Sequence, residues 1–311
     1  MQDRSLKNHQ TGGFRAVLYP VIGVISISLY FLNTLVMFPL FFIMSLLKLL
    51  PLKLWRKGCN YILNELGSIW ISINNINLIT TRNIKLEVTG VEGLRIDEWY
   101  LVISNHRSWA DILVLQKVFN RRIPFLKFFL KKELIWVPFM GIAWWGLDFP
   151  FMKRYSEGFL KKFPHLRGKD IEITRKACEK FRDIPVSVMN FVEGTRFTKD
   201  KHDRQGSPFI NLLKPKAGGI SFVLSALGGE RMKTILNVTI HYADGISSFW
   251  DFLCGKVSRV KVFVEELQIT EDMLGDYVED QAFKDTFQEW LNKLWLEKDR
   301  KLTALSQGEQ V

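Results

Sequence analysis

The sequence predicts an α/β domain, with a mixed central β-sheet flanked by helices, behind an N-terminal membrane-embedded helical segment. Hydrophobic residues make up 47% of the 311 positions, which is ample for a sizeable core. Past Asn75, short β-branched or aromatic runs alternate with helical patterns. Before that point, the run from Ala16 to Leu47 has no charged side chain and exceeds the roughly 20 residues that cross a bilayer core as helix.

The apolar N-terminal run fits two arrangements. Asn33, Thr34 and Pro39 would permit a hairpin that enters and leaves on one face, while a single tilted span fits equally well. A cleaved signal peptide fits poorly, because its apolar part is typically about 7 to 15 residues long. Basic residues flank both ends of the run, so they assign no orientation.

The next stretch, residues 48–73, mixes lysines and arginines with Leu, Trp and Ile. This pattern is typical of an amphipathic helix at a membrane surface, and equally of an ordinary helix packed on the following domain. We therefore predict a membrane anchor and amphipathic helix over residues 1–75, an α/β domain over 76–300, and a disordered tail over 301–311.

The α/β region yields six candidate strands and three candidate helices. The strands are "IKLEVTG" (84–90), "WYLVISN" (99–105), "WWGLDFPF" (144–151), "VSVMNFVEG" (186–194), "TILNVTIHY" (234–242) and "RVKVFVEEL" (259–267). The helices cover 111–119, 169–183 and 217–227. Sites in such sheets are usually built at strand ends, and polar clusters follow two of these strands.

The first cluster, "NHRSWAD", follows the strand that ends at Asn105. Ser108 can cap a helix beginning at Trp109, which places Asp111 in the first turn and turned back toward His106. A carboxylate that holds one imidazole nitrogen leaves the other free to take a proton, which is the general-base half of a nucleophilic triad. The same Ser-x-x-Asp spacing also suits a capping box, in which Asp111 only closes the helix start.

The second cluster, Glu193-Gly194-Thr195-Arg196, follows an apolar strand that ends at Val192. Glycine lets backbone amides turn toward an anion, and arginine offers a fork that matches phosphate. Further along the chain, Lys214 and Lys216 precede two glycines at a predicted helix start, where anions also bind. These features predict a pocket for a phosphate group, although a polar surface loop would have the same composition.

The net charge of +11 predicts an attraction to polyanions, either nucleic acid or an anionic membrane. The segment 121–146 carries five of these basic residues among Phe, Trp and Leu, as a surface lying on anionic headgroups would, or as a core with exposed lysines would. Because the charge is interleaved with apolar segments and no nucleic-acid module is recognisable, the membrane is favoured. Three scattered cysteines indicate neither a metal site nor a disulfide framework.

The order of the motifs resembles the glycerolipid acyltransferases, the 1-acylglycerol-3-phosphate O-acyltransferase family. The matching blocks are NHRSWAD (105–111), GLDFPFMKR (146–154), FVEGTR (191–196), KPKAGG (214–219) and NVTI (237–240). The resemblance implies that His106 and Asp111 are catalytic. It also implies that the glycerol phosphate is bound by Arg154, Glu193, Gly194, Thr195 and Arg196. Lys153 stands where the family usually has an acidic residue, which makes this pocket more positive.

The resemblance implies transfer of a fatty acyl group from acyl-CoA or acyl carrier protein to a lysophospholipid, most simply 1-acylglycerol-3-phosphate. We expect no cofactor or metal, and we expect the catalytic domain on the cytoplasmic side of the membrane, the inner membrane in a bacterium. Three rival readings stay open: another lysophospholipid headgroup, a thioesterase or hydrolase that uses the same His-Asp pair on water, and a non-catalytic membrane-tethered lipid-binding protein.

Overall fold

The computed structural model describes residues 3–81, 84–152, 181, 184–246, 248–277 and 279–309, with side chains described from residue 17 onward. A six-stranded sheet forms the centre of the molecule, in the order β1-β8-β7-β2-β6-β3. Its strands are β1 (Lys85–Thr89), β2 (Trp99–Ser104), β3 (Leu126–Phe128), β6 (Ser187–Phe191), β7 (Met232–Tyr242) and β8 (Arg259–Gln268). All neighbouring pairs are parallel except β7 and β8, so the predicted mixed sheet is confirmed.

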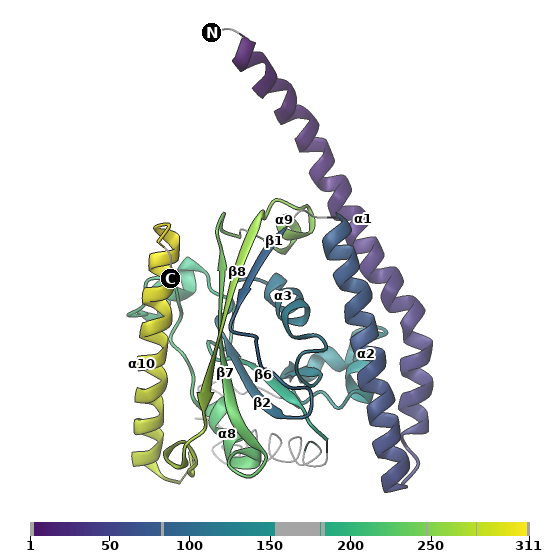
Figure 1. Ribbon diagram of the computed structural model, residues 1–311, viewed down its shortest axis with the longest axis vertical. Coiled ribbons are helices and arrows are strands. Elements are labelled where there is room, and N and C mark those ends of the chain that lie inside the picture. Colours follow the sequence, from purple (N-terminus) through teal and green to yellow (C-terminus); the bar gives the residue numbers. More distant parts are fainter. Residues whose placement is uncertain are drawn as a thin grey trace.

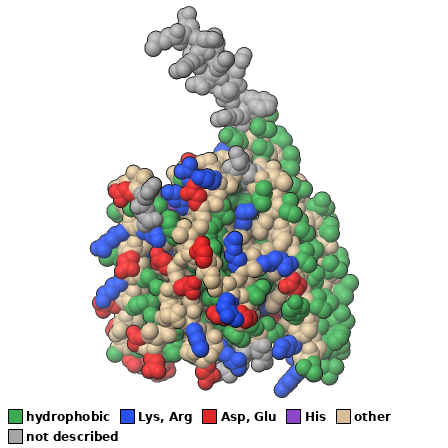
Figure 2. Space-filling view, in the orientation of Figure 1, with side chains coloured by type: hydrophobic (Ala, Val, Ile, Leu, Met, Phe, Trp, Pro, Cys, Tyr) green, Lys and Arg blue, Asp and Glu red, His purple; other side chains and the backbone are tan. Residues whose placement is uncertain are grey.

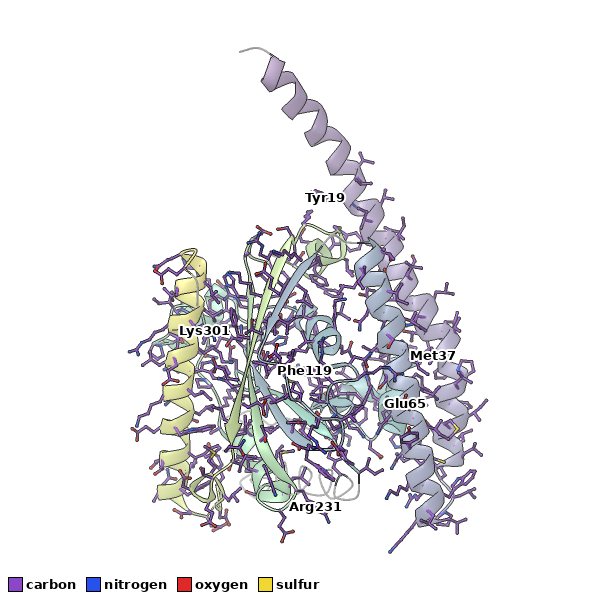
Figure 3. All side chains as sticks on the ribbon, in the orientation of Figure 1. Tyr19, Met37, Glu65, Phe119, Arg231 and Lys301 are labelled. Atoms are coloured by element: carbon purple, nitrogen blue, oxygen red, sulfur yellow. The ribbon has the colours of Figure 1, made fainter. Side chains whose placement is uncertain are left out.

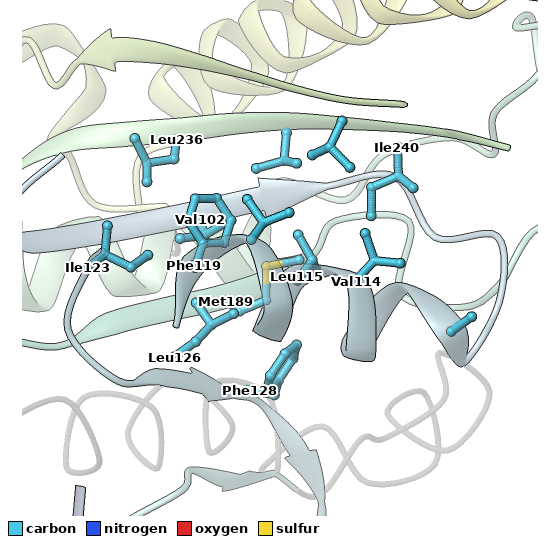
Figure 4. Close-up of a cluster of buried hydrophobic side chains, with 14 of the residues drawn as sticks. Val102, Val114, Leu115, Phe119, Ile123, Leu126, Phe128, Met189, Leu236 and Ile240 are labelled. Carbon is cyan, nitrogen blue, oxygen red and sulfur yellow. The ribbon is translucent and has the colours of Figure 1, made fainter. Parts of the chain in front are cut away.

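Helices cover both faces of the sheet, because the buried strands alternate apolar side chains between two cores. In β2, Tyr100 and Val102 point to one core, which includes α3 (Ala110–Phe119). Figure 4 shows Val114, Leu115 and Phe119 of α3 facing Val102 and Leu236. Leu101 and Ile103 point to the other core, against α8 (Gly218–Leu227) and α10 (Gln281–Ser306).

The N-terminal part of the chain is a hairpin of two long helices, α1 (Asp3–Leu47) and α2 (Lys53–Thr81), on the side of the sheet opposite α10 (Figure 1). Figure 3 accordingly places Met37 and Glu65 on the hairpin and Lys301 on the far helix. The chain turns between the two helices and not within the apolar run, which α1 crosses unbroken through Pro39. α1 contains one stretch, Val17–Leu47, that is long and apolar enough to cross a membrane.

The two hairpin helices are joined by polar side chains inside the apolar run. Asn33 Nδ2 donates to Asn74 Oδ1 at 2.7 Å and to Trp70 O at 3.0 Å. Farther along the same helix–helix contact, Asn77 Nδ2 donates to Ser26 O at 3.0 Å. The outer surface of the hairpin is apolar, as Figure 2 shows in the hydrophobic side chains gathered over α1 and α2. Asn33 and Ser26 of α1 therefore serve helix–helix contact, whereas many of the apolar residues of α1 face outward.

The loop after α3 runs between the sheet and the hairpin. It contains the short strands β4 (Leu130–Lys131) and β5 (Phe151–Met152), a 3₁₀ turn η1 (Lys132–Trp136) and helix α4 (Met140–Gly146). The predicted strand over residues 144–151 was therefore wrong for its first part, which is helical, and only its end is extended. At the loop, Lys48, just after α1, forms an ion pair with Asp148 and donates to Gly146 O at 2.8 Å.

Two further sequence predictions are corrected in this part of the molecule and at the C-terminus. Lys127, expected on a membrane-facing surface, is buried, with its ammonium 4.9 Å from the Phe181 ring centre. Helix α10 continues to Ser306 through the segment that we expected to be disordered from residue 301, because Leu302 and Leu305 are buried. The predicted helix over 169–183 lies outside the described residues.

Candidate active site

The two polar clusters lie at the same edge of the sheet. β2 and β6 are parallel neighbours, and Ser104 and Phe191, their last residues, are directly paired. The chain therefore delivers His106 and Glu193 from adjacent strand ends. Phe197 N, just after the second cluster, donates to His106 O at 2.8 Å. The two clusters, which follow separate strands in the sequence, therefore lie next to each other in the structure.

Asn105 explains why a buried strand stops on a polar residue. Its side-chain amide takes the place of a peptide group next to β7: Nδ2 donates to Ile240 O at 2.9 Å and Oδ1 accepts from Ile240 N at 2.9 Å. These two bonds continue the pairing with β7 after β2 has ended. The backbone is thereby free to turn away from the sheet and to present His106.

His106 and Asp111 form a buried pair at the start of α3. The distance between His106 Nδ1 and Asp111 Oδ2 is 2.8 Å, and the carboxylate has no exposed surface. The same oxygen accepts the backbone N–H of Arg107 at 2.7 Å and of Ser108 at 2.9 Å. Asp111 therefore matches both interpretations of the motif. It closes the helix start, and it also holds the imidazole through Nδ1.

The remaining oxygen of Asp111 is held by a residue that the sequence analysis did not single out. Tyr242 Oη donates to Asp111 Oδ1 at 2.6 Å, from the last position of β7. Burial and the neighbouring Asp111 carboxylate raise the pKa of Tyr242 well above its usual value of 10. Local sequence gives no signal for this contact, because the two residues are 131 positions apart.

The imidazole of His106 is largely buried and packs against two aromatic rings. One face stacks on Phe191, with ring centroids 3.9 Å apart and planes 12° from parallel. The ring edge faces Trp109, whose side chain is 47% exposed. With Asp111 accepting from Nδ1, Nε2 is the nitrogen left to take a proton, and no hydrogen bond to it is found among the described residues.

Glu193, which was predicted to bind substrate, has its carboxylate turned into the protein. Its side chain is fully buried, and its two oxygens accept the backbone N–H groups of His106 at 3.0 Å and of Leu213 at 2.9 Å. Burial raises the pKa of Glu193 to about 7, against the lowering effect of these two hydrogen bonds. The carboxylate therefore positions the backbone around the histidine.

Three other predicted anion-binding residues, Gly194, Thr195 and Arg196, lie in the turn after β6, which contacts the start of α3. Gly194 has a φ of +71°, a left-handed conformation that favours glycine and turns the chain after β6. The exposed Arg196 guanidinium lies 5.1 Å from the centre of the Trp109 ring. Thr195 Oγ1 accepts from Lys201 Nζ at 2.9 Å, a lysine that the sequence analysis did not consider.

The two lysines of the KPKAGG motif, Lys214 and Lys216, differ in their surroundings. Lys216 is exposed, runs alongside Gly194, and donates its backbone N–H to Val192 O at 2.8 Å. Lys214 is also exposed, and its backbone N–H donates to Gln205 Oε1 at 3.2 Å. Only Lys216 is thus placed beside the Glu193–Arg196 turn by a described contact. Arg154, the remaining predicted ligand, lies outside the described residues.

An apolar cavity of about 150 Å³ lies between α3, the helical hairpin and α4. Its walls include Phe38 of α1, Trp70 of α2, Ile112 of α3 and Ala143 of α4. Ile112 follows Asp111 directly in the chain, so the cavity begins one residue away from the His106–Asp111 pair. One wall of this apolar cavity is therefore built on the same helix, α3, that carries Asp111.

The structure thus places a sheet-edge histidine, hydrogen-bonded to a carboxylate at a helix start, next to the turn that follows β6. The family model described as Acyltransferase matches residues 85–241, about half of the chain, and covers both clusters. The chain therefore belongs to the acyltransferase family.

Known relatives share modest identity with this chain. The human 1-acyl-sn-glycerol-3-phosphate acyltransferase gamma is 26% identical over 215 residues, covering 65% of this chain and 52% of that protein. The human delta protein is 25% identical over 213 residues, with 64% and 51% covered. The chain thus spans about half the length of the curated relatives it matches. The crystal structure of a 1-acyl-sn-glycerophosphate (LPA) acyltransferase from Thermotoga maritima aligns with a TM-score of 0.48 and 15% identity, over 91% of this chain and 97% of that one.

Proposed function

We propose that this acyltransferase moves a fatty acyl group from a thioester donor to the free hydroxyl of a lysophospholipid, and that 1-acylglycerol-3-phosphate is the acceptor, giving phosphatidic acid. The observation that carries the proposal is the buried pair of His106 Nδ1 and Asp111 Oδ2, 2.8 Å apart, with the Glu193–Arg196 turn against it. The names of the relatives support the acceptor. The donor is acyl-CoA or acyl carrier protein.

In the proposed mechanism, His106 Nε2 takes the proton of the acceptor hydroxyl as its oxygen attacks the thioester carbonyl. Asp111 stabilises the imidazolium that forms, and the proton then passes to the leaving thiolate, which departs as a thiol. No covalent acyl-enzyme is needed, because the acceptor supplies the nucleophile. Phosphate binding by exposed cations such as Arg196 would hold the hydroxyl close to Nε2.

The apolar cavity supports an acyl substrate in particular. Its described lining is aromatic and aliphatic, apart from Thr34 and Gln116, so it suits a hydrocarbon chain better than a soluble polar acceptor. Because its walls are shared between the catalytic domain and the hairpin, a lipid chain could pass between bilayer and site without crossing water. Membrane attachment through α1, with the catalytic domain on the cytoplasmic side, is part of the same proposal.

The proposal is tested by an acyl-transfer assay on membranes that contain the wild type, His106→Ala or Asp111→Ala. Labelled acyl-CoA and acyl carrier protein are offered separately, each with 1-acylglycerol-3-phosphate and with lysophospholipids of other headgroups. We expect both variants to accumulate and to lose transfer by roughly 10² to 10⁴-fold. Wild-type transfer by either variant refutes the mechanism, and release of free fatty acid without an acceptor assigns the site to a hydrolase.

A further inference from the structure

We propose that Tyr242 is a positioning residue of the active site, which fixes the orientation and charge of Asp111 and thereby sets the pH range over which His106 acts as a base. This inference rests on the proposed function. It extends the His-Asp pair to a third side chain, which comes from β7 and belongs to none of the motif blocks.

The hydrogen bonds of Asp111 are divided unequally between its two oxygens. Oδ2 accepts from three donors, His106 Nδ1 and the backbone N–H groups of Arg107 and Ser108. For Oδ1, the phenol of Tyr242 is the one donor found among the described residues. Without that phenol, a carboxylate oxygen would remain unsatisfied at a position with no exposed surface.

This division has an electrostatic consequence for the imidazole. A donor on Oδ1 draws part of the carboxylate charge away from Oδ2, the oxygen that faces His106. Loss of the donor concentrates the charge on Oδ2, so the protonated imidazole is held more strongly and releases its proton at a higher pH. The bond also fixes the rotation of the carboxylate, and hence the direction in which Nε2 points.

The other charged groups around the phenol are few. Arg107, in the turn before α3, is the second charged side chain that acts on Tyr242. Arg107 is itself flanked by carboxylates from two further elements, Glu193 after β6 and Asp299 on α10. On β8, the residue paired with Tyr242 is Val260, whereas Lys261 pairs with His241. Because its pKa is raised, the phenol stays protonated and remains a donor over the whole working range of a histidine base.

The first test compares Tyr242→Phe with a matched control, Tyr100→Phe, in the full-length protein in detergent–phospholipid micelles. Tyr100 is also buried on the sheet, and its Oη accepts from Arg95 N at 3.0 Å at the start of β2, away from the site. The pH dependence of kcat/KM is measured for both. We expect Tyr242→Phe to lower kcat about tenfold and to move the acidic limb upward by about half to one pH unit, and Tyr100→Phe to leave the limb in place.

A second measurement does not depend on acyl transfer. The rate at which diethyl pyrocarbonate modifies His106, read by mass spectrometry across a pH series, reports when the imidazole loses its proton. We expect the midpoint of this curve to rise in Tyr242→Phe. If that variant fails to accumulate, 3-fluorotyrosine placed site-specifically at position 242 keeps the shape and makes the phenol more acidic, and we then expect the midpoint to fall.

The outcomes separate the two proposals. Unchanged midpoints in the phenylalanine and fluorotyrosine proteins overturn the role of Tyr242, even where His106→Ala abolishes transfer. A shifted midpoint together with full activity of His106→Ala keeps the Tyr242–Asp111–His106 coupling and refutes the proposed reaction. Equal shifts in the Tyr100→Phe control also overturn the inference, since they assign the effect to general destabilisation.

Discussion

At the scale of single residues, Glu193 connects parts of the chain that the sequence keeps apart. Its carboxylate receives one backbone N–H from the turn after β2 and another from Leu213, just before the fourth block. The buried location makes the charged form costly, which is why its pKa rises to about 7. Through its bond to the His106 N–H, this buried carboxylate supports the backbone that carries the histidine.

We expect Glu193→Gln to change how stability depends on pH. The folded protein holds the Glu193 proton up to a pH of about 7, whereas the unfolded chain releases it near 4.5. The contribution is thus fully present below pH 4.5 and is lost as the pH rises through about 7. Thermal unfolding in detergent at a series of pH values should show the Tm of the wild type falling across this window relative to the variant. Glu230→Gln, at an exposed position, is the control, and parallel curves for wild type and Glu193→Gln would contradict the prediction.

At the scale of elements, the hairpin depends on polar contacts in an apolar setting. Asn33 and Asn74 are buried, and their 2.7 Å bond, with the bond from Asn33 to Trp70 O, fixes the register of α1 on α2. This explains why the apolar run contains an asparagine near its middle.

A double-mutant cycle measures this contact. Asn33→Ala, Asn74→Ala and the double variant are compared by their free energies of unfolding in mixed detergent. Because the unfolded helices in a membrane find other polar partners, we expect a coupling energy of about 0.6 kcal/mol, with about 1.7 kcal/mol as an upper bound. Strictly additive effects would show that the two asparagines do not interact.

Helix α4 forms one wall of the apolar cavity, and it can be used to test whether an acyl chain enters. Ala143 lines the cavity, whereas Ile142, on the same helix, is 37% exposed. We expect Ala143→Phe to fill part of the space and to reduce transfer from long-chain acyl-CoA more than from short-chain acyl-CoA. Ile142→Phe should leave the chain-length profile unchanged. An equal loss at every chain length for Ala143→Phe would argue against acyl binding in this cavity.

Elements that are set by a local residue pattern could be predicted from the sequence. Elements that are set by contacts between distant segments could not. β2, β6, β7 and β8 follow their β-branched runs closely, and α3 begins one residue after the predicted start at Trp109. Trp144 and Trp145 have strand-like composition, but they lie in α4 next to the hairpin. Similarly, the His-Asp pair lies within one short motif, whereas Tyr242 reaches Asp111 only because β7 neighbours β2 in the sheet.

At the scale of the whole molecule, charge and apolar surface are separated. The hairpin exposes aliphatic and aromatic side chains along both helices, and most of the charged groups visible in Figure 2 lie on the rest of the surface. A soluble monomer rarely exposes so continuous an apolar area, so this side is suited to lipid. The apolar cavity lies between that side and the sheet.

If α1 anchors the protein in the membrane, a high-salt wash should not release the protein. In about 1 M NaCl, charges are screened beyond about 3 Å, so a protein held by its lysines and arginines would be released. We expect the full-length chain to stay in the membrane pellet under this treatment and to be extracted only by detergent. Recovery in the salt wash would show that residues 17–47 are not an integral anchor.

The carboxylate of Glu193 also limits how this protein can diverge. Since one side chain holds the backbone of two separate loops, its replacement disturbs both loops in a single step, and no change in either loop alone restores them. Lineages that alter this position must therefore rebuild the two loops together. Positions whose side chains only line the apolar cavity have no such constraint, so substitutions there can reshape the cavity while the His106–Asp111 pair stays intact.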